Sequence, residues 1–293
     1  MAPLAGSRAH EALFWRRAAR WGATRGPEWF VRYAPTLIGW AAAACIPSAR
    51  DAVRRNLERV RGRTSPARDA QDVLETFATY AACLTDSLAS DTEAGRVLTR
   101  VDVVNQGYLD EALAFRKGLV IVTAHTAGWD VVGPRFAERH GVGLVLVKRA
   151  EADTNAGDFH DEARRRAGVE VAHVGDPLAS LPLLRHLKDG GVVALQLDRR
   201  PPGMKTRTTS LLGAPASFPE GPFRLAQLSG APILPLFCER SGHRTYRVHV
   251  YRPRTLERRA SEAAIDEVAR HIGASMTEFL RSHPTQWFHF EDG

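Results

Sequence analysis

The sequence predicts an α/β fold, in which a mixed, largely parallel sheet is flanked by helices and preceded by a helical N-terminal segment. Short apolar runs at 119–124 and 192–197 follow glycines and are typical of buried strands in a parallel sheet. Stretches with apolar residues at three- and four-residue spacing lie between such runs and indicate helices. A chain of 293 residues is long enough for one large α/β domain. We therefore expect a helical segment over 1–95 and a single α/β unit over 96–293.

The first 95 residues are expected to form basic, amphipathic helices. The longest apolar run, 36–46, is too short to span a bilayer, which needs about 20 apolar residues, and no signal peptide is evident. Aromatic and arginine side chains flank this run, which suits a helix that lies at a membrane surface. A buried helix that packs on the α/β core is the alternative, and one helix could do both. Two more helices are predicted at 50–63 and 67–88.

Strands and helices are expected to alternate from residue 101 onward. The expected strands are 101–104, 119–124, 143–147, 169–174, 192–197 and 231–237, with an edge strand at 246–251. The expected helices are 108–116, 158–168, 178–188, 222–228 and 261–281, and another follows Gly128. Pro134 lies inside that last helix, which predicts a late start or a kink. Residues 201–219 are rich in Pro, Gly and Thr and are expected to form a long loop.

The composition narrows the class of protein. A hydrophobic content of 44% excludes wholesale disorder. A net charge of +7 allows nucleic acid, an anionic membrane or an acidic substrate as partner. The basic helices lack any recognisable nucleic-acid module or stacking platform, so no nucleic-acid partner is expected, although an arginine-rich nucleic-acid binder is one alternative. Cys45, Cys83 and Cys238 fit no zinc spacing and no disulfide framework, which favours a reducing compartment.

The candidate catalytic residues are His125 and Asp130, which lie between the run 119–124 and the helix that follows it. A strand-to-helix turn places such groups at the carboxyl end of the sheet, where open α/β sheets have their sites. A carboxylate at 130 would fix the imidazole tautomer while the other ring nitrogen accepts a proton from a hydroxyl. The chain has no Gly-x-Ser-x-Gly elbow, so the nucleophile would be the substrate itself. The plainer alternative is that His125 caps a helix and Asp130 is a surface charge.

The surrounding stretch H-T-A-G-W-D resembles the His-x4-Asp/Glu (HX4D) motif of the lysophospholipid acyltransferase superfamily, in the branch of the lipid A late acyltransferases. Gly128 stands where that branch usually has Asn, and Asp130 where it usually has Glu. Asp also occurs here among actinobacterial relatives that acylate mannosylated phosphoinositides, so the departure bears on the acceptor more than on the reaction. Residues 231–237 resemble the branch's fourth motif and 284–287 its closing Pro-x-Gln-Trp, so the resemblance covers about 29–290.

The resemblance also implies substrate-binding residues. Two cations at a strand end suit a phosphate, and the branch has a basic residue there and an Arg four residues before a Gly. Motif order places the acid of the third motif at 198 rather than in the F-P-E-G of 218–221, which we interpret as a coincidental turn. That acid and the arginine after it would hold the acceptor or order the site. The resulting candidates are Lys148, Arg149, Arg164, Asp198 and Arg199.

The acyl chain is expected to lie beside Trp129, Leu211 and Leu212, since Leu-Leu-Gly stands where the branch has Phe-Phe-Gly. The resemblance implies acyl transfer from acyl carrier protein or coenzyme A to a hydroxyl of a lipid or glycolipid, either lipid A-like or phosphoinositide mannoside-like. No metal or other cofactor is expected. The protein would be peripheral or monotopic on the cytoplasmic face of the inner membrane. Acylation of a secondary metabolite or polyene head group, and a non-catalytic lipid-binding protein, are the alternatives.

Overall fold

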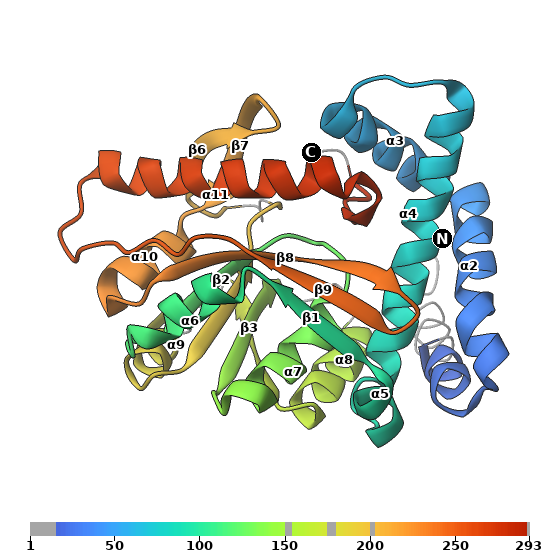
Figure 1. Cartoon of the computed structure of the whole chain (residues 1–293), viewed down its shortest axis with the longest axis horizontal. Helices are drawn as coiled ribbons and strands as arrows, with labels where there is room; N and C mark the ends of the chain where they lie inside the picture. Colours follow the sequence, from blue (N-terminus) through green and yellow to red (C-terminus); the bar gives the residue numbers. More distant parts are fainter. Residues whose placement is uncertain (1–15, 150–153, 175–179, 200–202, 292–293) are drawn as a thin grey trace, which may run out of the picture.

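The computed structural model describes residues 16–149, 154–174, 180–199 and 203–291 (Figure 1). Its centre is a seven-stranded sheet of order β1-β9-β8-β2-β5-β3-β4. The strands are β1 (Arg100–Val104), β2 (Leu119–Thr123), β3 (Leu144–Arg149), β4 (Val169–Val174), β5 (Val192–Gln196), β8 (Ile233–Gly242) and β9 (Thr245–Val250). Five of them, from β8 to β4, run parallel, whereas β9 is antiparallel to β8 and β1 is parallel to β9. The predicted mixed, largely parallel sheet is confirmed.

Helices cover both faces of this sheet. They are α6 (Gln106–Ala114), α7 (Trp129–His140), α8 (Thr154–Arg166), α9 (Ser180–Lys188), α10 (Gly221–Ser229) and α11 (Glu262–Ser282). Side chains alternate along a strand, so Val120 and Val122 of β2 pack with α9, α10 and α11, while Leu119 and Ile121 pack with α6 and α7. Figure 1 shows α11 and α7 on opposite sides of the sheet. Of the two alternatives predicted for α7, a late start or a kink at Pro134, the late start is wrong, because the helix begins at Trp129 and includes Pro134.

The N-terminal part is helical, as expected. Residues 16–25 are followed by α2 (Glu28–Cys45), α3 (Pro47–Arg61), α4 (Pro66–Ala89) and α5 (Glu93–Leu98), so the predicted division at residue 95 falls inside α5. A small core, which includes Val53 and Phe77, joins α2, α3 and α4. The Phe77 ring packs against Phe290, with 5.1 Å between ring centroids, and so connects this layer to the C-terminal segment. Within the described ranges, no helix combines the length and apolar character needed to cross a membrane.

Two predictions about the second half of the chain are wrong. The expected loop over 201–219 contains an antiparallel hairpin, β6 (Thr206–Leu211) and β7 (Ala214–Pro219). Its two turn residues, Leu212 and Gly213, both have positive φ, as two-residue hairpin turns of this kind require. The strand β9 is not at an edge, because it lies between β1 and β8. Its alternating pattern reflects one face of the sheet that is only partly covered, rather than a free edge.

Candidate active site

The turn between β2 and α7 lies at the carboxyl end of the central strands. β2 is fully buried between β5 and β8, and the chain then turns through Gly128 into α7. Gly128 has φ of +78°, and a Cβ there would lie 2.2 Å from Cδ1 of Tyr246. Only glycine fits this turn, because other residues would meet both the unfavourable φ and the buried tyrosine ring. The turn therefore places His125 and Asp130 at a defined position on the sheet.

His125 is bound to Asp198, which follows β5. Its ring Nδ1 lies 2.8 Å from Oδ1 of Asp198, and its backbone N–H donates to both carboxylate oxygens at 3.1 Å. Nε1 of Trp287 donates to Oδ2 of the same carboxylate at 3.0 Å. The His125 carbonyl accepts a hydrogen bond of 2.7 Å from the backbone N–H of Phe288. The histidine is thus fixed by the adjacent strand β5 and by the C-terminal segment.

The Asp198 carboxylate remains ionised despite complete burial. Its side chain is 0% exposed, and burial by itself would raise its pKa. The attraction of His125 in its protonated form, together with the hydrogen bonds from His125 and from the N–H of Trp287, outweighs burial and brings the pKa of Asp198 well below its ordinary value. A carboxylate can only accept hydrogen bonds, so Nδ1 carries the proton of the neutral imidazole. Nε2 of His125 is then the nitrogen that can accept a proton.

Asp130 contacts a different partner from the one expected. Its Oδ1 accepts a hydrogen bond of 2.8 Å from Nε of Arg164, on α8. The carboxylate that contacts Nδ1 of His125 is therefore that of Asp198. The sequence predicts Asp130 there, but Asp130 pairs with Arg164. Asp130 lies in the first turn of α7, where it meets Arg164 of α8. Asp198 instead follows β5, the strand next to β2, and therefore lies beside His125. The catalytic roles of these residues stay predictions.

A second, buried carboxylate connects the cations of the site. Asp161 accepts from Nζ of Lys148 at 2.8 Å and from Nη1 of Arg164 at 2.9 Å, and its other oxygen lies 3.0 Å from Nε2 of His173. Burial alone would lower the pKa of Arg164, but Asp130 and Asp161 outweigh it and raise the pKa above its ordinary value. Sequence reasoning missed Asp161, although its spacing of three from Arg164 on a helix was a signal for such a pair.

A cavity of about 1410 Å³ opens beside these groups. His125, Asp130, Lys148, Arg164, Asp198 and Arg199 form its polar wall. Trp129 and Leu211 line it together with Leu184, Phe218, Leu225 and Leu228, which come from α9, β7 and α10. Leu212 packs against the core instead and is not among the described lining residues. The side chain of Arg149, at the end of β3, lies outside the described residues.

Arg199 holds the C-terminal segment rather than facing open solvent. Its Nη2 donates to the carbonyl oxygen of Phe288 at 3.1 Å. Its Nε is buried and has no hydrogen-bond partner among the described residues. Arg199 and Trp287 therefore both tie the last segment of the chain to the end of β5, one through a carbonyl and the other through Asp198.

Comparison with known proteins gives one consistent result. The sequence model of the bacterial lipid A biosynthesis acyltransferases matches residues 9–292. Proteins named phosphatidylinositol mannoside acyltransferase, from two strains of Mycobacterium tuberculosis, are 29% identical over 286 residues, which cover 94% of this chain and 86% of the relative. A protein of the same name from Mycolicibacterium smegmatis is 27% identical over 194 residues, which cover 64% of this chain and 62% of that protein.

Proposed function

This chain belongs to the family of bacterial lipid A biosynthesis acyltransferases, and from that premise we propose that it transfers a fatty acyl chain from a thioester to a hydroxyl of a phosphoinositide mannoside-like glycolipid. It is an acyltransferase that acts on a lipid or glycolipid acceptor. The names of its relatives favour the mannoside acceptor over a lipid A-like one. The observation that carries the mechanism is the hydrogen bond between His125 and the buried carboxylate of Asp198, at the wall of a partly apolar cavity.

The proposed reaction uses Nε2 of His125 as the general base. Nε2 takes the proton of the acceptor hydroxyl as its oxygen attacks the thioester carbonyl carbon. The Asp198 carboxylate stabilises the imidazolium that forms. The tetrahedral intermediate then collapses, the carbon–sulfur bond breaks, and the imidazolium returns its proton to the leaving thiolate. An ester and a free thiol result, without an acyl-enzyme, and the donor is a thioester of coenzyme A or of acyl carrier protein.

The cations of the cavity are proposed to bind the anionic part of a substrate. Lys148 and Arg164 share the carboxylate of Asp161, which fixes their positions. Arginine has five N–H donors, of which the bonds to Asp130 and Asp161 use two, so Arg164 keeps donors for the oxygens of a phosphate. The positive charge of Lys148 lies beside that of Arg164. The Arg164–Asp130 pair would at the same time set the edge of the cavity beside His125. Both the donor and a phosphoinositide acceptor carry phosphate, so either can occupy this wall.

The apolar wall is proposed to hold the acyl chain. Side chains from the hairpin β6–β7, α9 and α10 line it, and so does Trp129, the first residue of α7 after the histidine turn. The cavity volume of about 1410 Å³ exceeds the roughly 300–1000 Å³ of ordinary small-molecule sites, which suits a substrate with a polar head and a long chain. Trp129 and Leu211 are the predicted groove residues that support this proposal, since both are buried and both line the cavity.

The N-terminal helix α2 is proposed to lie on the cytoplasmic face of the inner membrane. Trp29, Tyr33 and Leu37 repeat at four-residue spacing and are 66%, 59% and 63% exposed. Aromatic and aliphatic side chains on one helix face, with arginines nearby, are typical of helices that bind at a bilayer surface. The protein would then be peripheral or monotopic. Flotation with vesicles that contain anionic phospholipid tests this, with Trp29→Ser and Leu37→Ser expected to reduce binding and the exposed Val97→Ser on α5 as the control.

The function is tested with the purified chain, an acyl-coenzyme A donor and a phosphatidylinositol mannoside acceptor. His125→Ala is expected to lower turnover by about 10²- to 10⁴-fold, the usual contribution of a general base. His140→Ala, at the far end of α7, is the control and should keep wild-type turnover. Retention of activity within about tenfold in His125→Ala would refute the assigned base. The wild-type chain would instead be a lipid-binding protein if it bound the lipid but showed no turnover with either acyl-coenzyme A or acyl carrier protein as the donor.

A further inference from the structure

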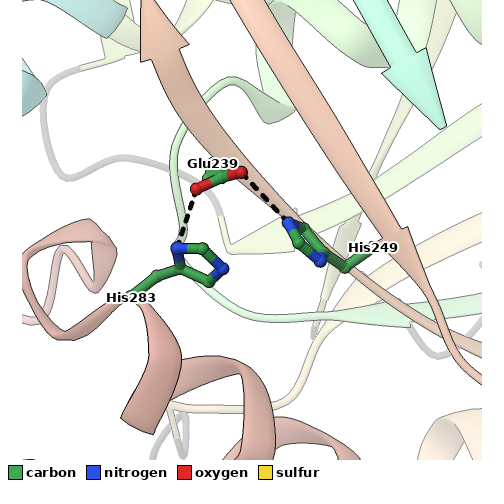
Figure 2. A group of neighbouring side chains, drawn as sticks. All are labelled: Glu239, His249 and His283. Atoms are coloured by element: carbon green, nitrogen blue, oxygen red, sulfur yellow. Dashed lines mark hydrogen bonds and ion pairs between the residues drawn. The ribbon is translucent and has the colours of Figure 1, made fainter. Parts of the chain in front are cut away.

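Three side chains outside the acyl-transfer cavity converge on one point (Figure 2). Glu239 lies on β8, His249 on the adjacent strand β9, and His283 caps the C-terminus of α11. Nδ1 of His283 is 2.7 Å from Oε2 of Glu239, and Nε2 of His249 is 3.2 Å from Oε1. Their side chains are 8%, 18% and 21% exposed for Glu239, His249 and His283 respectively.

We propose that Glu239, His249 and His283 bind one divalent transition-metal ion, with zinc as the best match to the donor set. Their ligand atoms all lie within 4.8 Å of one another. Zinc binds His nitrogen and carboxylate oxygen at about 2.0–2.2 Å, which places tetrahedral ligands about 3.3 Å apart. The two Glu–His distances, 3.2 and 2.7 Å, lie near that value, so side-chain rotations that bring the two imidazoles together would form a three-ligand site. Two imidazole ligands favour zinc and its neighbours over the oxygen-seeking magnesium and calcium.

The surroundings of the cluster orient these ligands. Nη1 of Arg247 donates to Oε1 of Glu239 at 2.8 Å, and its side chain is 44% exposed, so it approaches from the solvent side. Carboxylates that bind a metal commonly accept such an outer hydrogen bond. The ring of Phe279 packs against both imidazoles, with centroid distances of 5.4 Å to His249 and 4.9 Å to His283. These contacts restrict both rings to rotations about their present positions.

A metal here would be structural rather than catalytic. It would join the end of α11 to the strands β8 and β9, just before the short helix η1 (Pro284–Gln286). Trp287 follows η1 directly and donates to Asp198. The bound ion would therefore stabilise the segment that carries Trp287, without contact with the reacting atoms. The proposal does not depend on the acyl-transfer mechanism.

The test is a zinc titration of the tag-free full-length chain after treatment with a chelator. Calorimetry is expected to show one ion per chain, and a free zinc concentration of about 100 times Kd is expected to raise Tm by about 5 °C. Cobalt should give the visible absorption of a nitrogen- and oxygen-ligated ion at the same stoichiometry. His249→Gln, His283→Gln and Glu239→Gln should each weaken binding by about 100-fold or more.

His271→Gln is the matched control, because His271 also lies on α11 but bonds to the carbonyl oxygen of Arg252. It should bind zinc as the wild type does. Absence of saturable binding to the wild-type chain overturns the proposal, whatever the variants do. Undiminished binding in the three cluster variants, with circular dichroism showing that they are folded, also overturns it, because the ion then lies elsewhere.

Discussion

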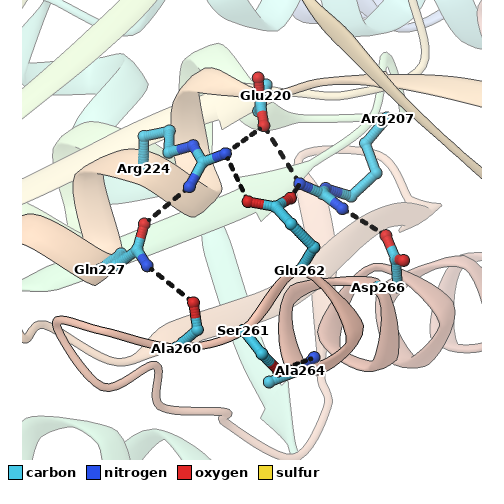
Figure 3. A network of polar contacts seen from close by, with 9 residues as sticks. All are labelled: Arg207, Glu220, Arg224, Gln227, Ala260, Ser261, Glu262, Ala264 and Asp266. Atoms are coloured by element: carbon cyan, nitrogen blue, oxygen red, sulfur yellow. Dashed lines mark hydrogen bonds and ion pairs between the residues drawn. The ribbon is translucent and has the colours of Figure 1, made fainter.

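Two polar networks hold parts of the C-terminal third of the molecule in place, and they differ in burial. The site network consists of His125, Asp198 and Trp287, with an acid that is 0% exposed. The hairpin network joins β6, α10 and α11 through Arg207, Glu220, Arg224, Glu262 and Asp266 (Figure 3). Its acids at 262 and 266 are 66% and 49% exposed. Both networks use charge-assisted hydrogen bonds, but only in the first is the acid fully shielded from water.

This difference decides what each network can do. A buried carboxylate interacts strongly with its partners and leaves a costly unpaired group when one partner is removed. Exposed ion pairs are screened by water and salt, and they contribute little individually. The site network can therefore set the tautomer of His125, whereas the hairpin network only positions the hairpin beside the cavity. We therefore expect large effects on turnover or stability for changes in the site network, and small effects for changes in the hairpin network.

The largest effect is expected for Asp198→Asn. The amide keeps the shape of the carboxylate but no longer stabilises an imidazolium or enforces the proton on Nδ1 of His125. Turnover should fall by about 10³- to 10⁴-fold, as for the corresponding change in a catalytic triad. Steady-state kinetics with saturating acceptor measures this. Turnover within about tenfold of the wild type would show that the buried network does not orient the base.

The same variant has a defined pH dependence. The pKa of Asp198 in the folded protein lies below its ordinary value, so its contribution to stability is fully present above that ordinary value and is lost progressively as pH falls from there to the lower pKa. The difference in Tm between wild type and Asp198→Asn should stay constant from about pH 5 to 8 and shrink below about pH 4. A difference that shrinks already between pH 7 and 5 would contradict the lowered pKa.

A smaller loss is expected for Gly128→Ala. The new methyl group would lie 2.2 Å from the ring of Tyr246 and would also disfavour the φ of +78°. Crowding and the left-handed backbone together should cost about 2–5 kcal/mol of unfolding free energy. Urea denaturation measures the loss. Gly141→Ala is the control, since it has φ of +60° but nothing within 4 Å of its Cβ, so it isolates the backbone contribution.

Tyr246→Phe is a smaller change to the side chain that packs against Gly128, because it removes only the hydroxyl group. The Tyr246 hydroxyl donates to Oδ2 of Asp86 at 2.6 Å, and Nε of Arg240 donates to the same oxygen at 3.1 Å. Loss of one bond to a buried carboxylate should cost about 1–2 kcal/mol, because Arg240 still compensates its charge. Kinetic parameters should change less than in Asp198→Asn. An unchanged unfolding free energy would mean that water replaces the hydroxyl, and that this part of the site is less buried than the contacts indicate.

The sequence identifies more of the fold than of the contacts inside the site. Apolar runs and helical spacing are local, so the order of strands and helices follows from them. The pairing of His125 with Asp198 joins residues that are 73 positions apart, and no local pattern encodes it. Motif order did place Asp198 near the site, but it could not distinguish which of two acids reaches the imidazole. The hairpin was missed because its turn uses Leu212 at positive φ, where a non-glycine residue is unusual.

The smallest effect is expected for Glu262→Gln in the hairpin network. Glu262 accepts from Arg207 and Arg224, which lower its pKa chiefly through the Arg207 hydrogen bond, yet its side chain is largely exposed. Glu220 and Asp266 also bind Arg207, so the hairpin keeps its anchor when the acid at 262 is neutralised. Tm should change by less than about 2 °C, and less still at high salt. A larger, salt-independent change would show that the hairpin network behaves like the buried one, and that exposure does not separate the two regions.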